Sequence, residues 1–277
     1  MAWDFQSLPY PLLIIRMFEL ISPLLSVISV GLEPADILKT LRPLACLFND
    51  CRVEIIVVIP FSNASSPLFD FPAKIIFDHG DGVYQAMNQG ISASSGDYLW
   101  FLNSGDQTLL SSYDLQALLE SLVDLKYNSV SKPLLLYGSR LAFLNLSPYR
   151  FASVILLQLC LVLSVMPVSH QNILFPRLSH KPFSLSYSYS CDFEILATLL
   201  FRTAVTVIFP SPLPIAKLSR GGISDVNRMI VFRERLAIVR LALHPCLMPI
   251  VFLGYLFRAS RELLAFQLKA LLSFVLR

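Results

Sequence analysis

Residues 78–106 read DHGDGVYQAMNQGISASSGDYLWFLNSGD. Within this stretch, residues 84–94 have the apolar spacing of a helix, and residues 98–103 form a continuous apolar run that is typical of a buried parallel strand. Polar residues stand where strands are expected to end, at 78–82 and at 103–106. Ligands of open α/β sheets bind beyond the carboxyl ends of the strands, so these two polar segments are the first candidates for a site.

The same alternation of strand and helix continues on both sides of this stretch. It predicts an α/β fold with a mostly parallel central sheet flanked by helices. The other expected strands are residues 25–30, 53–59, 74–77, 134–137 and 205–209, and the other expected helices are residues 35–47, 114–125, 192–201, 229–243 and 261–276. We expect one domain over residues 20–225 and a helical tail over residues 226–277.

Composition narrows the class of protein. The chain has 277 residues, 55% of them hydrophobic and 15% charged, and a mean hydropathy of +0.63. A net charge of +3 is too small to argue for nucleic acid as a partner. The five cysteines include no C-x-x-C pair, which argues against a zinc cluster or a disulfide framework and favours a reducing, cytoplasmic setting.

The last third of the chain is both apolar and basic. This pattern fits the anionic face of a membrane, and it fits a solvated helix face equally well. Residues 241–257 are the best candidate for a membrane span, but His244, Pro245, Pro249 and Gly254 interrupt them. We therefore expect peripheral membrane contact through an interfacial or re-entrant segment rather than a clean span.

The segment FLNSGD at residues 101–106 ends in a carboxylate. Divalent cations such as Mg²⁺ and Mn²⁺ prefer oxygen ligands and bridge carboxylates to phosphates. Asp106 is therefore a candidate metal residue beside a diphosphate, where the cation would act as a Lewis acid. Asn, Ser, Gly and Asp are also ordinary turn residues, so the six residues taken alone favour a plain turn over a metal site.

Residues 82–106 resemble a pattern of bacterial family 2 glycosyltransferases. That pattern is G-[IV]-Y-[DQ]-A-M-N-K-G-I, about five residues, and then G-[DE]-Y-[ILV]-x-F-L-N-[SA]-[DG]-D. Weaker resemblances follow at MPVSHQNILF (166–175), SYSCDFEILATLL (188–200) and GGISDVNRMIVFRERLAIVR (221–240). The resemblance implies an A-type nucleotide-sugar fold, and it is nearest to transferases that build capsule, colanic-acid-like and other surface polysaccharides.

The resemblance also implies roles for individual residues. Asp106 would hold Mn²⁺ or Mg²⁺ and the diphosphate. Asp192 would be the general base that takes the proton of the acceptor hydroxyl, although a helix N-cap is the alternative for an aspartate at this position. His170 and Gln171 would line the acceptor or diphosphate side, and a structural role for His170 stays open. The implied donor-binding residues are Asp78, Asp81, Tyr84, Asn88, Asn103, Ser104 and Gly105.

Two positions depart from the family pattern. Ile59 stands where the second strand normally ends in an aspartate that contacts the nucleoside, and Ser139 stands where an aspartate is frequent. We expect an inverting transferase that moves a sugar from a nucleoside-diphosphate sugar to a saccharide or polyprenyl-linked acceptor at the inner face of the cytoplasmic membrane. A non-catalytic binding or scaffold subunit is the alternative that Ile59 motivates. The third hypothesis is an integral membrane protein, which only the high mean hydropathy suggests.

Overall fold

The computed structural model describes residues 22–63, 69–129, 132–138, 150–203, 206–218, 227–242 and 249. Its centre is a seven-stranded sheet in the order β3-β2-β1-β4-β7-β6-β8. Ser139, residues 261–276 and most of the candidate span 241–257 lie outside the described residues. The strands are β1 (Leu25–Val30), β2 (Val53–Pro60), β3 (Lys74–Asp78), β4 (Tyr98–Asn103), β6 (Leu134–Tyr137), β7 (Ile173–Pro176) and β8 (Val207–Ser211).

The sheet is mostly parallel, as the sequence predicts. β1 pairs in parallel with β2 on one side and with β4 on the other. β7 is antiparallel to both β4 and β6, and β6 is parallel to β8. The carboxyl ends of β1, β2, β3 and β4 therefore lie along one edge of the sheet, and both polar segments of the sequence lie on that edge.

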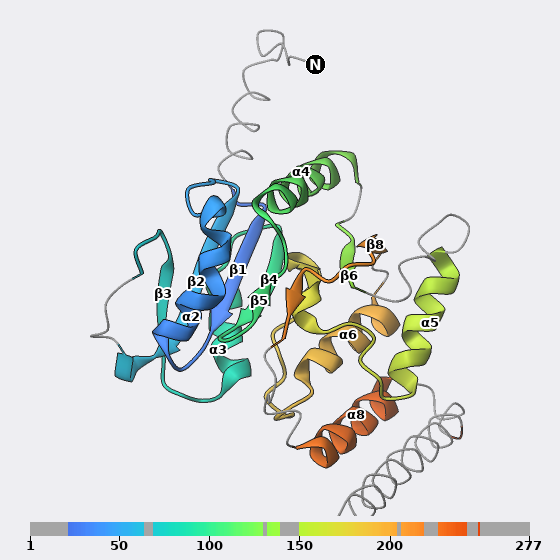
Figure 1. Cartoon of the computed structure of the whole chain (residues 1–277). Coiled ribbons are helices and arrows are strands. Elements are labelled where there is room, and N and C mark those ends of the chain that lie inside the picture. Colours follow the sequence, from blue (N-terminus) through green and yellow to red (C-terminus); the bar gives the residue numbers. More distant parts are fainter. Residues whose placement is uncertain are drawn as a thin grey trace, which may run out of the picture.

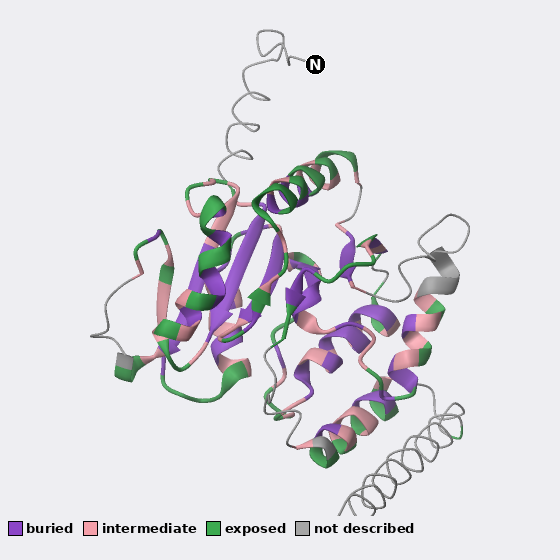
Figure 2. Cartoon of the chain, in the orientation of Figure 1, coloured by how far each residue is buried: buried purple, intermediate pink, exposed green. Residues whose placement is uncertain are grey.

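Helices cover both faces of the sheet (Figure 1). On one face, α2 (Pro34–Leu41), the 3₁₀ helix η2 (Arg42–Leu47) and α4 (Ser112–Asn128) pack against one hydrophobic cluster. On the other, α3 (Val83–Ala93), α5 (Arg150–Val162), α6 (Cys191–Arg202) and α8 (Arg228–Ala242) pack against a second cluster. The central strands β1, β2 and β4 are largely buried, whereas the edge strand β3 is partly exposed and α2 and α4 expose their outer faces (Figure 2).

The predicted helix over residues 35–47 is wrong in its second half. The structure has α2 as far as Leu41 and then a 3₁₀ helix that carries Pro43 in its first turn. Proline has no N–H to donate and its ring clashes with the carbonyl four residues earlier, so an α-helix does not continue through it. Further along, α4 begins at a capping box in which Ser111 and Asp114 each accept the other's backbone N–H.

Apart from short 3₁₀ helices, four elements of the described structure have no counterpart in the sequence prediction. They are α5, β7 and the two-residue strands β5 (Gln107–Thr108) and β9 (Ala216–Lys217), which pair antiparallel in a separate small sheet. Helix α5 falls within an apolar stretch that the hydropathy pattern leaves ambiguous between core helix and membrane contact. Leu157 and Leu161 of α5 are fully buried in the core.

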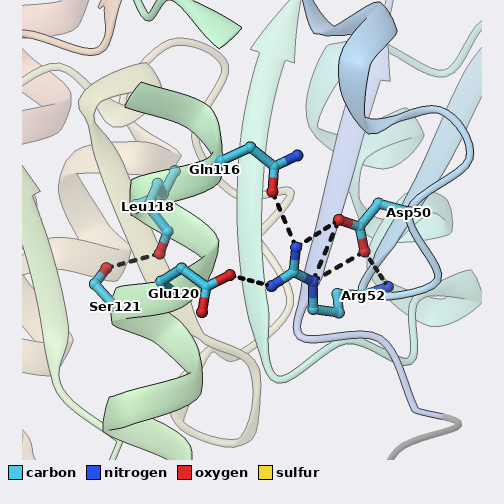
Figure 3. Close-up of polar contacts among 6 residues, drawn as sticks. All are labelled: Asp50, Arg52, Gln116, Leu118, Glu120 and Ser121. Atoms are coloured by element: carbon cyan, nitrogen blue, oxygen red, sulfur yellow. Dashed lines mark hydrogen bonds and ion pairs between the residues drawn. The ribbon is translucent and has the colours of Figure 1, made fainter. Parts of the chain in front are cut away.

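Arg52 ties the start of β2 to helix α4 at the edge of the sheet opposite the polar segments. Its guanidinium donates to both carboxylate oxygens of Asp50, to Glu120 at 2.8 Å and to Gln116 at 3.0 Å (Figure 3). The forked guanidinium can serve several acceptors at once, which an ammonium group cannot do with the same geometry. This contact fixes α4 against the β1–β2 half of the sheet.

Among the residues that the structure describes, none of the helices combines the length and the apolar character that a bilayer span requires. The described part of the predicted tail is α8, which packs against α6. The boundary near residue 225 stays a prediction.

Candidate functional site

The turn after β4 holds the carboxylate of Asp106 in one orientation. Its Oδ2 accepts hydrogen bonds from the backbone N–H of Asn103 (2.9 Å) and from the side-chain amide of Gln171 (3.0 Å). The residue is 3% exposed. Gly105 adopts a φ of +90°, which a residue with a side chain rarely takes. The turn is therefore closed around a carboxylate at the carboxyl end of a buried strand.

Two neighbouring elements support this turn. Thr40 of α2 accepts a hydrogen bond from the N–H of Gly105 (2.9 Å) through its Oγ1. At the end of β1, a Cβ built on Gly31 would stand 2.4 Å from the Cβ of Ser104, so only a glycine lets these two chain segments approach so closely. The sequence pattern singles out neither Thr40 nor Gly31, because both contacts join segments about 65 to 75 residues apart.

Asn172 fastens β9 to the same region. Its Oδ1 accepts from the N–H groups of Ile215 (2.8 Å) and Ala216 (2.9 Å), and its Nδ2 donates to the carbonyl of Ala216 (3.0 Å) and to Ser169 Oγ (2.8 Å). β9 in turn pairs with β5, which directly follows Asp106. Asn172 thus supports the far side of the carboxylate turn.

His170 links the turn to the first turn of α6. One ring nitrogen, Nε2, lies 3.5 Å from the Asn103 amide, and the other, Nδ1, lies 3.4 Å from Oδ2 of Asp192. Asn103 also bonds Asp106, so the polar contacts run from Asp106 through Asn103 and His170 to Asp192. The structure therefore brings the predicted metal residue and the predicted base into one network.

Asp192 lies in the first turn of α6, with a side chain that is 16% exposed. Burial works to raise the pKa of its carboxyl, but the hydrogen bond and charge of His170, the charge of Arg235 and the N–H of Phe193 outweigh burial and hold the pKa below its usual value. The helix dipole also favours an anion at this end. Asp192 is not the N-cap of α6, because Ser190 occupies that position and Asp192 lies within the helix, where its carboxylate accepts from the N–H of the adjacent Phe193.

Tyr84 of α3 faces the same helix end. Burial first, and then the nearby Asp192 and Cys191, raise the pKa of its hydroxyl, so the phenol stays neutral. Its ring lies 5.4 Å from that of Phe183. One helical turn further along α3, Asn88 exchanges two hydrogen bonds with the backbone of Phe183, at 2.7 and 2.9 Å. Asn88 therefore fixes the loop before α6, and its contact with a donor stays a prediction.

The carboxyl ends of β2 and β3 are built differently. Asp78 is 7% exposed and accepts a hydrogen bond from Gly80 N–H (2.7 Å), whereas Asp81 is exposed. Ile59 is 3% exposed and packs in the hydrophobic core. The segment that follows it, as far as the structure describes it, carries no carboxylate before residue 64, so the nucleoside side of the predicted site lacks the acid that the family pattern has.

No protein-family model and no curated protein sequence matches this chain. Several solved structures match it in fold. TarS of S. aureus matches at 12% identity with a TM-score of 0.52, over 84% of this chain and 42% of that one; in a TarS 1–349 structure the matched share of that chain is 70%. Glucosyl-3-phosphoglycerate synthase of Mycobacterium tuberculosis, in complex with Mn²⁺, UDP and phosphoglyceric acid, matches at 14% identity with a TM-score of 0.51, over 87% of this chain and 83% of that one.

The chain has the A-type glycosyltransferase fold. This confirms the fold predicted from residues 82–106. At these identities the likeness concerns the fold, and the chain spans less than half of the full TarS chain.

The carboxylate turn offers a set of oxygen atoms that suits a hard cation. Asn103 Oδ1 and Gln171 Oε1 are both buried, and within the described structure neither has a hydrogen-bond partner, although both residues bond Asp106 through other atoms. Amide and carboxylate oxygens are the ligands that Mg²⁺ and Mn²⁺ prefer. Within the described ranges, no group of three or more His, Cys, Asp or Glu side chains forms a metal cluster. The oxygen atoms of Asp106, Asn103 and Gln171 are therefore of the type that a divalent cation takes as ligands.

Proposed function

We propose that this chain transfers a sugar from a nucleoside-diphosphate sugar to a hydroxyl group of a saccharide or lipid-linked acceptor, with inversion, in surface polysaccharide synthesis. The observation that carries the proposal is the network that joins Asp106 to Asp192 through Asn103 and His170. It places a cation-compatible acid and a separate ionised carboxylate at one edge of an A-type fold. The UDP bound in the M. tuberculosis structure supports the same class of donor.

In this reaction a bond forms between the acceptor oxygen and the anomeric carbon as the bond from that carbon to the diphosphate breaks. The acceptor proton passes to Asp192, and the nucleoside diphosphate leaves. Because the pKa of Asp192 is held low, the carboxylate is ionised and able to accept at neutral pH, and the proton moves only as the new bond forms. Asp106, Asn103 and Gln171 would hold the cation, which neutralises charge on the leaving diphosphate.

The experiment is donor hydrolysis and transfer with a panel of nucleotide sugars and manganese. We expect Asp192→Asn to lower the rate of transfer by about 10² to 10⁴-fold while donor binding persists, since a general base contributes that much. Asp106→Asn should weaken manganese-dependent donor binding. Asp124→Asn, which changes an exposed carboxylate on α4, is the matched control. If Asp106→Asn and Asp192→Asn both behave like this control, the proposal fails.

A binding or scaffold subunit without transferase activity is the second candidate. The buried Ile59 favours it, because an aliphatic side chain cannot accept a hydrogen bond from a base or ribose. Calorimetric titration with UDP and with GDP, each with manganese, separates the two candidates. Binding that requires Asp106 supports the transferase, and the absence of nucleotide binding supports the scaffold.

We also propose that the protein works at the inner face of the cytoplasmic membrane. Helix α8 supports this proposal, because Met229 (63%), Ile230 (45%) and Leu241 (68%) are exposed beside the exposed Arg233 and Arg240. Apolar and basic side chains on one exposed surface suit an anionic bilayer. Co-sedimentation with vesicles that contain anionic lipid should exceed that with neutral vesicles, and equal recovery with both would contradict the proposal.

A further inference from the structure

The backbone that leads into Asp192 is held by helix α8. Glu234 of α8 accepts two hydrogen bonds, one from Ser188 N–H (2.7 Å) and one from Tyr189 N–H (3.0 Å), using a different carboxylate oxygen for each. Ser190 adds a third contact, from its hydroxyl to the carbonyl of Val231 (3.3 Å). Three consecutive residues directly before α6 are therefore bonded to one helix, and they set where the first turn of α6 begins.

Arg235, the next residue of α8, reaches the other side of Asp192. Its guanidinium carbon lies 5.1 Å from the centroid of the Phe193 ring, a cation–π distance, and its Nη1 donates to the carbonyl of Ser164 (3.3 Å). The positive charge of Arg235 is also one of the causes that lower the pKa of Asp192. Glu234 thus holds the backbone three and four residues before Asp192, and Arg235 contacts Phe193, the residue that follows Asp192.

Packing alone does not explain these two charged residues. Ile238 and Val239 of α8 are buried in the hydrophobic core, and Val231 of the same helix is also buried. Burying part of a charged side chain costs free energy unless it is paired, so two partly buried charges on adjacent residues of one helix need compensating contacts. Glu234 and Arg235 find such contacts at the start of α6, beside which α8 lies (Figure 1).

We infer that helix α8 positions Asp192: Glu234 holds the backbone that leads to it, and Arg235 supplies the positive charge beside it. The inference rests on the proposed function for its catalytic purpose, and Glu234 and Arg235 are positioning residues that do not touch the substrate. The groups that face Asp192 are His170 from the segment before β7, Arg235 from α8, Tyr84 from α3 and Cys191 from α6 itself.

Two measurements on the full chain test the inference without relying on turnover. The first is an NMR titration of the Asp192 carboxyl carbon. Arg235→Met should raise the pKa of Asp192, and Arg235→Lys, which keeps the charge, should restore it toward the wild-type value. Arg233→Met, which removes a charge from the exposed side of the same helix, should leave it unchanged.

The second measurement is amide hydrogen exchange. Glu234→Ala should speed exchange at Ser188 and Tyr189 by about tenfold or more, the factor that corresponds to losing one hydrogen bond to a charged group. An unchanged Asp192 titration in Arg235→Met, or unchanged exchange at both amides in Glu234→Ala, would overturn the inference. A general loss of structure would change exchange throughout the chain, whereas the inference requires the change to be confined to the loop before α6.

Activity assays then separate this inference from the proposed function. If the inference holds, Glu234→Ala lowers kcat by about 10 to 100-fold with little change in the KM of the donor, as a small displacement of a catalytic group does. The acid limb of the rate profile should move to higher pH in Arg235→Met but not in Arg233→Met. If Asp192→Asn transfers as well as the wild type, the proposed base fails, while the titration and exchange results still decide what α8 does to Asp192.

Discussion

Removing the side chain of Asn172 should destabilise the protein strongly, because it leaves buried backbone groups without partners. In Asn172→Ala, the N–H groups of Ile215 and Ala216 and the carbonyl of Ala216 all lose their bonds to this side chain. Ile215 and Ala216 are each 2% exposed. An orphaned buried polar group costs about 1–3 kcal/mol, and water entering the vacated space re-pairs some of them, so we expect a loss of about 3–5 kcal/mol.

Urea unfolding followed by circular dichroism measures this loss. The midpoint should fall while the m-value stays constant, since the change alters stability and not the area exposed on unfolding. Asn128→Ala, at an exposed position near the end of α4, should change stability by less than about 0.5 kcal/mol. A loss below about 1 kcal/mol in Asn172→Ala would show that these bonds do not hold β9 as argued, as would unchanged amide exchange at Ile215 and Ala216.

Three other substitutions test the fold. Arg52→Met should lower the free energy of unfolding by about 1–2 kcal/mol, because the ion pairs of Arg52 are partly exposed. The hydrogen bond from Arg52 lowers the pKa of Asp50, so the stability that this pair gives the wild type should be lost as the pH falls through that pKa in acid denaturation. Burial lowers the pKa of His180 from 6.5 to about 4, so the stability of the wild type should fall by about 3 kcal/mol as the pH drops from 6.5 to 4. Urea titrations at each pH should show that His180→Phe removes most of this pH dependence. Gly96→Ala should lower the free energy of unfolding by about 1–3 kcal/mol, seen as a lower thermal midpoint, since its Cβ would lie 2.8 Å from the backbone nitrogen of Ser26.

The central strands could be predicted from the sequence because each is a continuous apolar run between turn residues. The predicted bounds of β1, β4 and β6 agree with the structure to the residue. The prediction was poorest where the apolar pattern has no clear period or where the element is very short. Helix α5 lies in an almost wholly apolar stretch, and β5 and β9 have two residues each, too few for any alternation to be read.

The residues at the centre of the site could be predicted from motifs, but the residues that hold them could not. Asn103, Asp106, His170 and Asp192 stand in recognisable segments, and the structure brings all four together. Thr40, Asn172, Glu234 and Arg235 support them through contacts that arise only when distant segments fold against one another. Of these four supporting residues, Asn172 was the easiest to find from the sequence, because it directly follows the candidate site residues His170 and Gln171.

The two halves of the site differ in how firmly the chain builds them. Asp106 is fixed by contacts from the turn itself, from Gln171 and from β9 through Asn172, and Asp192 is fixed between His170 and α8. At the end of β2, by contrast, Ile59 is packed into the core, and the exposed ring of Phe61 lies edge-on to that of Phe77 at a centroid distance of 6.1 Å. Hydrogen bonds select a particular base, whereas aromatic and aliphatic surfaces accept any. If the proposed transfer takes place, the binding free energy of the donor therefore comes mainly from its diphosphate and sugar, and discrimination between nucleosides is weak.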